Sequence, residues 1–299
     1  MCGIIGIQNN SEAATLAYMG LYAQQHRGQE GAGVVSSDGI DLHRHMGPGL
    51  VSDVFSNSNV FDSLVGDYAI GHVRYSTTGD SDPKNVGPLT FNMGDYSLSI
   101  AHNGNLVNID KIRKELQDDG ALFQTSTDTE IIIHLIARER GATLAEKLKR
   151  VLLKIEGAYS LILLSPNEII AARDPHGIRP FCMGKLKDTL VFASETCALD
   201  LLGAEYIREV NPGEIIVAND DGFETHIFTE PKQPKHCIFE YIYFSRPDSR
   251  IFGKNVDKMR RAFGRRLSRE YTKETGDIVI SVPDSSNTCA LGYSSESGV

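Results

Sequence analysis

The order of hydrophobic patterns along this chain constrains its fold most strongly. Short runs typical of strands, with one helix capped by Ser11, occupy the first hundred residues. Amphipathic helical patterns follow between residues 109 and 155, and strand patterns return between 158 and 218. Strands, helices and strands again are typical of a layered α+β domain, whereas a βαβ winding alternates the two kinds of element. The sequence therefore predicts an α+β fold.

The individual elements are predicted from periodicity and turn residues. Expected strands cover residues 3–8, 33–36, 40–45, 68–75, 97–102, 158–164, 168–173, 181–185, 190–193 and 214–218. Expected helices cover residues 109–117, 128–140 and 144–155, the second of them behind a capping box formed by Thr127 and Glu130. Ser37-Asp38-Gly39 predicts a hairpin between the second and third strands.

A composition change near residue 230 indicates a second unit. The segment TEPKQPK at 229–235 has two prolines and no apolar residue, which is typical of a linker. Beyond it we expect a long helix with a basic face at 255–275, a buried strand at 278–282 and a loop at 283–286. The predicted organisation is a domain at 2–229, a linker at 230–235 and the incomplete first part of an α/β domain at 236–299.

Charge and cysteine usage exclude several classes of protein. The net charge is −9 and no basic patch occurs, so we expect no nucleic acid and no membrane as a partner. No apolar run approaches the roughly 20 residues of a membrane span, and no basic and apolar leader precedes Cys2, so we expect a cytoplasmic protein. The five cysteines are scattered without a C-x-x-C pair, which predicts neither disulfides nor a complete zinc site.

Cys2 is the first candidate for chemistry. Removal of Met1 leaves a thiol and a free α-amine on one residue, and N-terminal nucleophiles are activated by their own amine. The reference pKa of an α-amine, ~7.7–8.0, is close to that of a thiol, ~8.5, so a proton transfers readily near neutral pH. The alternative is a small cysteine buried in a core.

Three further segments carry side chains that suit an amino-acid amide. Arg74 ends a strand, either as a solvated charge or as a planar fork for a carboxylate. Asn103-Gly104 follows a strand, either as a turn or as an amide and an N–H that point at one oxyanion. Asp128 lies at the start of a helix, where a carboxylate is stabilised by the helix dipole, and it could equally hold an ammonium group.

Together these segments resemble the class II glutamine amidotransferases, which use an N-terminal nucleophile. The resemblance covers nearly the whole chain. Its motifs are CGIIGI at 2–7, QHRGQEGAG at 25–33, GHVRYST at 71–77, AHNGNL at 101–106, TSTDTE at 125–130, ARDPHGIRP at 172–180, ASETCA at 193–198 and FEYIYFSRPDS at 239–249. His-Arg-Gly-Gln-Glu is most similar to the branch of purine biosynthesis that acts on phosphoribosylpyrophosphate.

The resemblance implies a fold and a set of roles. The fold is the four-layer αββα sandwich of N-terminal-nucleophile hydrolases, followed by the start of an α/β phosphoribosyltransferase domain. Cys2 attacks the glutamine amide, and Asn103 with Gly104 forms the oxyanion hole.

The resemblance also assigns residues that bind glutamine and residues that link the two domains. Arg74 binds the substrate α-carboxylate and Asp128 the α-ammonium, with Thr77 assisting. Arg27 is similar to the family position beside the nucleophile and is grouped with the glutamine-binding residues. Tyr243 is similar to the residue through which the two domains communicate.

The implied activity is that of an amidophosphoribosyltransferase, which converts glutamine, phosphoribosylpyrophosphate and water into phosphoribosylamine, glutamate and pyrophosphate. The implied cofactors are Mg²⁺ and, in one branch, a 4Fe-4S cluster whose first ligand Cys237 resembles; the implied assembly is a homotetramer. The acidic pair Asp220-Asp221 continues into a hairpin, so the phosphoribosylpyrophosphate site is expected outside this chain, as in a fragment. The alternatives are a stand-alone glutaminase and a regulatory glutamine-binding protein.

Overall fold

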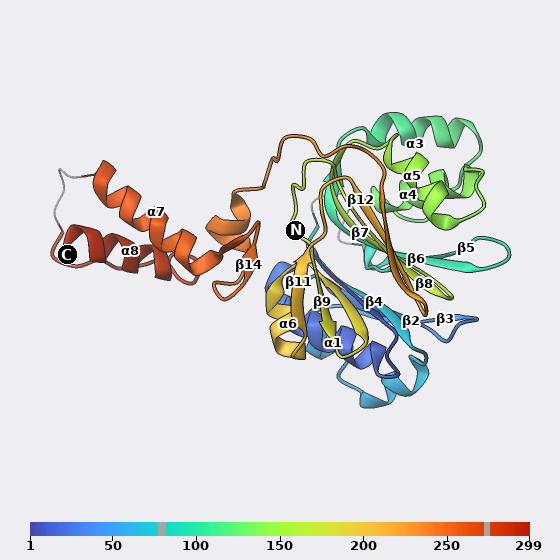
Figure 1. Cartoon of the computed structure of the whole chain (residues 1–299), viewed down its shortest axis with the longest axis horizontal. Coiled ribbons are helices and arrows are strands. Elements are labelled where there is room, and N and C mark those ends of the chain that lie inside the picture. The colour runs from blue at the N-terminus through green and yellow to red at the C-terminus, as the bar shows by residue number, and fades with distance from the viewer. Residues whose placement is uncertain (77–81, 272–275) are drawn as a thin grey trace.

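The computed structural model describes residues 1–76, 82–271 and 276–299 of the chain. Two stacked antiparallel sheets form its centre, and helices cover the outer face of each sheet (Figure 1). The predicted α+β class and the αββα order of layers are confirmed. Among the described residues, no helix is both long and apolar enough to cross a membrane.

The first sheet has seven strands in the order β11-β9-β10-β1-β4-β2-β3. Their bounds are β1 Gly3–Gln8, β2 Gly31–Ser37, β3 Leu42–Pro48, β4 Tyr68–Arg74, β9 Cys182–Leu186, β10 Thr189–Ala193 and β11 Glu205–Glu209. The central strand β1 is buried on both faces, which explains its nearly continuous apolar sequence.

The second sheet has six strands in the order β13-β12-β8-β7-β6-β5. Their bounds are β5 Leu89–Asn92, β6 Ser97–Leu106, β7 Gly157–Ser165, β8 Glu168–Arg173, β12 Glu214–Asn219 and β13 Gly222–Ile227. Strand β6 runs four residues past the predicted end at 102, because its pairing with β7 continues to Leu106 and Gly157.

Helices bury the outer faces of both sheets. The first sheet is covered by α1 Ala13–Ala23, α2 Val51–Val54 and α6 Thr196–Leu202, and the second by α3 Ile109–Asp118, α4 Thr129–Arg138 and α5 Leu144–Leu152. Alternation along β1 divides its side chains: Ile4 lies between the sheets with Ile70 and Ile162, whereas Ile5 packs outward beneath α1 with Leu21.

The caps predicted for the first helix at Ser11 and for the fourth helix at Thr127 and Glu130 do not form. Helix α1 begins at Ala13, and it is the side chain of Asn10 that accepts a hydrogen bond from the Glu12 N–H at 2.9 Å. Helix α4 begins at Thr129, and Glu130 accepts from the backbone of the preceding loop at Gln124, at 2.8 Å, so no capping box with Thr127 forms.

The segment after the sandwich forms an arm that projects from it (Figure 1). Residues 230–235 contain no helix or strand, and their role as a linker stays a prediction. They are followed by a π-helical turn η4 Glu240–Phe244, a hairpin of β14 Arg250–Ile251 and β15 Lys254–Asn255, and helices α7 Val256–Glu270 and α8 Asn287–Ser297.

The predicted buried strand at 278–282 is wrong. Ile278, Ile280 and Val282 are 76, 83 and 80% exposed, and the segment belongs to none of the sheets among the described residues. An apolar run becomes a strand only where a neighbouring strand pairs with it and a surface buries it.

Candidate active site

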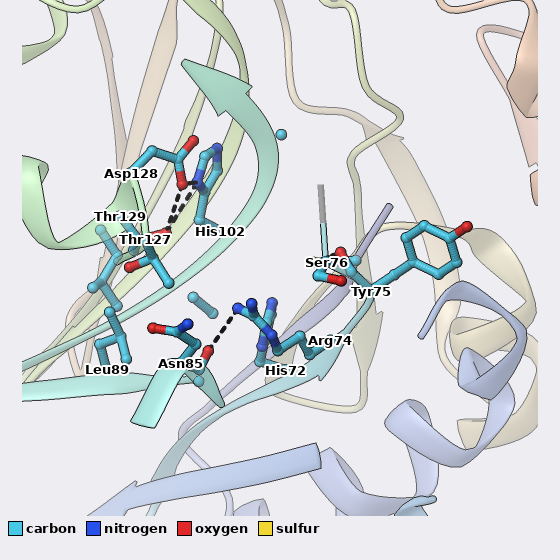
Figure 2. A pocket seen from close by; sticks show the side chains of 15 residues that line it. His72, Arg74, Tyr75, Ser76, Asn85, Leu89, His102, Thr127, Asp128 and Thr129 are labelled. Carbon is cyan, nitrogen blue, oxygen red and sulfur yellow. Dashed lines mark hydrogen bonds and ion pairs between the residues drawn. The ribbon is translucent and has the colours of Figure 1, made fainter. Parts of the chain in front are cut away.

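The two sheets and α4 enclose a pocket at one end of the sandwich (Figure 2). Cys2 lies just before β1, Arg74 ends β4, Gly104 belongs to β6, and Asp128 immediately precedes α4. The other lining residues are His72, Tyr75, Ser76, Asn85, Gly87, Leu89, Ile100, Ala101, His102, Thr127 and Thr129. Residues from four separate parts of the sequence, each predicted as a candidate, therefore meet in one cavity.

Cys2 opens into this pocket with its thiol near the end of β4. Its Sγ lies 3.6 Å from the carbonyl oxygen of Tyr75. Met1 precedes it, so the Cys2 nitrogen is a peptide nitrogen here, and the predicted role of the Cys2 α-amine requires removal of Met1. Burial lowers the pKa of the Met1 α-amine to about 6.

Asn103 and Gly104 lie inside a strand, so their interpretation as a turn is wrong. Asn103 pairs with Ser160 and Gly104 with Tyr159 in the register of β6 and β7. Asn103 is fully buried, and neither polar atom of its side chain has a hydrogen-bond partner among the described residues. Such an unpaired amide costs free energy in the folded protein, and a strand residue that keeps it is a candidate for binding a ligand.

Gly104 is required by close packing. A Cβ at this position would lie 1.9 Å from the carbonyl oxygen of Ala158 and 2.6 Å from Nε2 of His102. Only glycine lets β6 approach β7 this closely at the pocket wall.

Arg74 and Asp128 supply opposite charges to the pocket. Arg74 is buried; its Nη1 donates to the carbonyl oxygen of Asn85 at 2.8 Å, and its Nε lies 3.7 Å from Oε2 of Glu30. Oδ2 of Asp128 accepts from the Leu106 N–H at 3.0 Å. Burial by itself raises the pKa of Asp128, but the neighbouring His102 and this N–H lower it below the ordinary value. Thr77, the third predicted glutamine contact, lies outside the described residues.

Two histidines in the pocket were missed by the sequence analysis. His72 lies two residues before Arg74 on β4, and His102 lies two residues before Gly104 on β6, so each shares a face with a predicted site residue. Burial, followed by the charge of Arg74, lowers the pKa of His72 to about 3. The period of two in a strand was the available signal for both.

The chain is similar to known proteins over its whole length. Residues 72–201 match the model of a glutamine amidotransferase domain. Over its whole length the chain is 48% identical to amidophosphoribosyltransferase 2 of Arabidopsis thaliana and 46% identical to the amidophosphoribosyltransferase of Bacillus subtilis. The chain is thus similar to amidophosphoribosyltransferases over its whole length and contains a match to a glutamine amidotransferase domain.

Two solved structures are similar to the whole chain. A structure described as the allosteric regulatory enzyme of purine biosynthesis superposes on the whole chain with a TM-score of 0.96 at 45% identity. The glutamine phosphoribosylpyrophosphate amidotransferase of B. subtilis, complexed with ADP and GMP, superposes with a TM-score of 0.95. The chain covers 64% of each of these two structures, and 53 and 62% of the Arabidopsis and Bacillus relatives.

Arg27 lies beside the nucleophile, as the family resemblance implies, but it does not line the pocket. Its side chain is 0% exposed, and its Nε donates to the carbonyl oxygen of Cys2 at 3.0 Å. Its remaining nitrogens face the carboxylates of Glu195 and Glu240. Direct binding of glutamine by Arg27 therefore does not fit this geometry, because protein carboxylates already occupy the guanidinium.

Tyr243 lies on the arm, 63% exposed, and connects to the pocket through aromatic rings. Its ring centroid lies 5.4 Å from that of Phe244, which lies 6.1 Å from that of Tyr75 on the pocket wall. Tyr243 is thus linked to the pocket wall through the ring of Phe244, and its predicted role in communication between domains stays a prediction.

Cys237 lies in the extended segment before η4, where its N–H donates to the carbonyl oxygen of Ile178 at 3.1 Å. In the described part of the chain, no group of three or more His, Cys, Asp or Glu side chains could hold a metal ion. The Mg²⁺ ion and the 4Fe-4S cluster with Cys237 as its first ligand therefore stay predictions about the intact protein.

Proposed function

We propose that this chain carries the glutamine-hydrolysing part of an amidophosphoribosyltransferase. The observation that supports this most directly is the convergence of Cys2, Arg74, Gly104 and Asp128 on one pocket. A nucleophile, a cation for a carboxylate and a carboxylate for an ammonium group are what the amide of a free amino acid requires.

The reaction begins with removal of Met1. The α-amine of Cys2 takes the thiol proton as Sγ attacks the amide carbon of glutamine, and the carbonyl oxygen becomes an oxyanion. The amine then gives the proton to the amide nitrogen, the C–N bond breaks, and ammonia leaves a γ-glutamyl thioester on Cys2. Water hydrolyses the thioester, which releases glutamate and restores the thiol.

The remaining site residues bind the charges of the substrate. Asn103 Nδ2 and the Gly104 N–H donate to the oxyanion, where preorganised donors are worth most. Arg74 binds the α-carboxylate and Asp128 the α-ammonium, so both hold the amino-acid end of glutamine in the ground state and in the transition state.

We infer the activity of the whole protein from the relatives to which this chain is similar. We infer that the ammonia reacts with phosphoribosylpyrophosphate to give phosphoribosylamine, with glutamine and phosphoribosylpyrophosphate as the small-molecule substrates. We infer a homo-oligomer in the cytoplasm from the similarity of the chain to these relatives.

Labelling of Cys2 tests the proposal. The mature chain is expected to begin at Cys2 by intact mass, and a glutamine analogue with an electrophilic carbon is expected to modify Cys2. Cys2→Ala is expected to abolish glutamate release, while Cys237→Ala, which changes a partly exposed cysteine outside the pocket, leaves it unchanged.

Two other outcomes contradict the proposal. Glutamine binding without glutamate release by the trimmed protein indicates a regulatory glutamine-binding protein. Full activity in Cys2→Ala contradicts the nucleophile itself.

A further inference from the structure

A buried charge network connects Cys2 to the arm. The planar guanidinium of Arg27 binds the Cys2 carbonyl oxygen through Nε at 3.0 Å. At its other end, Nη1 and Nη2 bind the two carboxylate oxygens of Glu240 at 3.0 and 2.9 Å, and Nη1 also contacts Glu195. Arg27, Glu195 and Glu240 are all 0% exposed.

Glu240 lies on the first turn of η4, beyond the linker, and is held there by its own segment. Its Oε2 accepts a hydrogen bond from the Ser245 hydroxyl at 2.8 Å. Ser245 is in turn fixed by Arg260 of α7, whose Nη2 donates to its carbonyl oxygen at 2.8 Å. The arm therefore fixes the Glu240 carboxylate in addition to its contact with Arg27 of the sandwich.

Glu195, at the start of α6, holds the same network from the side of the sandwich. Its Oε2 accepts from the Arg246 N–H at 2.9 Å and from the Ser249 hydroxyl at 2.7 Å, and its Oε1 lies 2.8 Å from Nε2 of His26. Burial by itself raises the pKa of Glu195, but the charge of Arg27 and the hydrogen bond of His26 hold it well below its ordinary value. The site thus contains charged groups that no solvent screens.

The geometry of a guanidinium turns this network into a positioning device. The five N–H groups of arginine lie in one rigid plane, so a two-point contact with Glu240 fixes the direction in which Nε points. That direction ends at the carbonyl of Cys2, the residue that carries the thiol. We propose that Glu240 is a positioning residue, which acts through Arg27 to hold Cys2 in the orientation required for attack.

The inference rests on the proposed role of Cys2 as nucleophile. It also means that the orientation of the nucleophile depends on where the arm places one carboxylate. Displacement of η4 therefore rotates the plane of the Arg27 guanidinium and shifts the backbone carbonyl of Cys2.

A second buried carboxylate provides a matched control. Glu214 of β12 is 1% exposed and receives a two-point contact from Arg208 at 2.7 and 2.8 Å. Neither residue lines the pocket or contacts Cys2. Glu214→Gln therefore removes the same charge from an ion pair of the same two-point geometry, in which Arg208 is partly exposed, without reaching the nucleophile.

The test compares Glu240→Gln with Glu214→Gln in the 299-residue chain. Three quantities are measured for each: kcat and KM of glutamine hydrolysis, the melting temperature, and the rate at which iodoacetamide alkylates Cys2, read by peptide mapping with Cys289 as the internal standard. In Glu240→Gln, kcat and the Cys2 alkylation rate are expected to fall by about tenfold to a hundredfold, as small misplacement of a reacting group does, with KM nearly unchanged. In Glu214→Gln only the melting temperature is expected to fall.

Glu240→Asp keeps the test decisive if Glu240→Gln does not fold. It retains the charge but is one methylene shorter, so it cannot keep both contacts with Arg27, and a fall in kcat without a rise in KM supports positioning. Normal kcat and normal alkylation in a folded Glu240 variant overturn the proposal, as does an equal fall of kcat in Glu214→Gln. A parent chain no faster than Cys2→Ala contradicts the proposed function itself and is thereby distinguished from failure of the positioning role.

Discussion

Nδ1 of His102 lies 3.5 Å from Oδ1 of Asp128 at the wall of the pocket (Figure 2). Burial by itself lowers the pKa of His102, but the charge of Asp128 and the hydrogen bond between them raise it above its ordinary value. The same carboxylate is fixed through its other oxygen by the Leu106 N–H. An ammonium group that enters the pocket therefore meets a carboxylate whose orientation is already set.

Asp128→Asn is expected to raise KM for glutamine by about tenfold to a hundredfold, the value of one hydrogen bond between charged groups, with a smaller change in kcat. The amide oxygen still accepts from Leu106, so the local backbone is retained while the negative charge is lost. Steady-state glutamate release measures both constants. Asp110→Asn, the same change in the first turn of α3, is the control and is expected to leave KM unchanged. A loss confined to kcat would contradict the ground-state role of Asp128.

Asn103→Leu is expected to lower kcat by about 10²–10³, as loss of one oxyanion donor does, with a modest change in KM. The free energy of unfolding is expected to stay the same or to rise, because the change removes a buried amide that has no partner. Urea unfolding and steady-state kinetics together check this. Ser36→Ala, which removes an unpaired buried hydroxyl outside the pocket, is the control. Its free energy of unfolding is likewise expected to stay the same or to rise relative to the parent chain, and its activity is expected to be full. A strongly destabilised Asn103→Leu would indicate a structural role instead.

Much of this fold could be predicted from the sequence because local patterns and global packing agree. The hairpin through Ser37-Asp38-Gly39 and the helix behind Thr143 need only neighbouring residues, and both formed. The predicted caps of α1 and α4 do not form. Asn10 accepts a hydrogen bond from the Glu12 N–H, and Glu130 accepts one from the Gln124 N–H. Which N–H group a polar side chain accepts from depends on the three-dimensional arrangement of the loop, which residue spacing alone does not predict.

The site could be predicted only as a set of residue types. Arg27 is predicted among the residues that bind glutamine, but the carboxylates that its guanidinium binds belong to Glu195 and Glu240. Glu240 lies 213 residues further along the chain, so nothing near Arg27 in the sequence indicates this contact. Asn103 illustrates the converse: its motif indicates the residue, but only the structure shows that its buried side-chain amide has no hydrogen-bond partner among the described residues.

His72 is expected to make the protein less stable in mild acid. The folded state keeps His72 neutral until its pKa of about 3, whereas the unfolded chain binds a proton near the ordinary value of 6.5. The unfolded state therefore binds more protons between these values, and stability is lost as the pH falls through 6.5. From pH 7 to pH 5 the loss due to this residue is about 2 kcal/mol. Urea unfolding at both pH values should show this difference between the parent chain and His72→Gln, and equal losses in both would contradict it.

Removal of the arm at residue 235 is expected to destabilise the sandwich, although the cut falls at the end of the predicted linker. It removes Glu240, so Arg27 keeps one carboxylate partner in place of two. It also removes the Arg246 N–H and the Ser249 hydroxyl, which donate hydrogen bonds to Glu195. Breaking a buried ion pair costs about 3–5 kcal/mol, which for a domain of this size lowers the melting temperature by about 10 °C. A chain that ends at residue 271 is the control, because it loses α8 but keeps this network. Differential scanning calorimetry of the two truncated chains decides the matter. If both melt at the same temperature, the contacts of Glu240 with Arg27 add nothing to the stability of the sandwich.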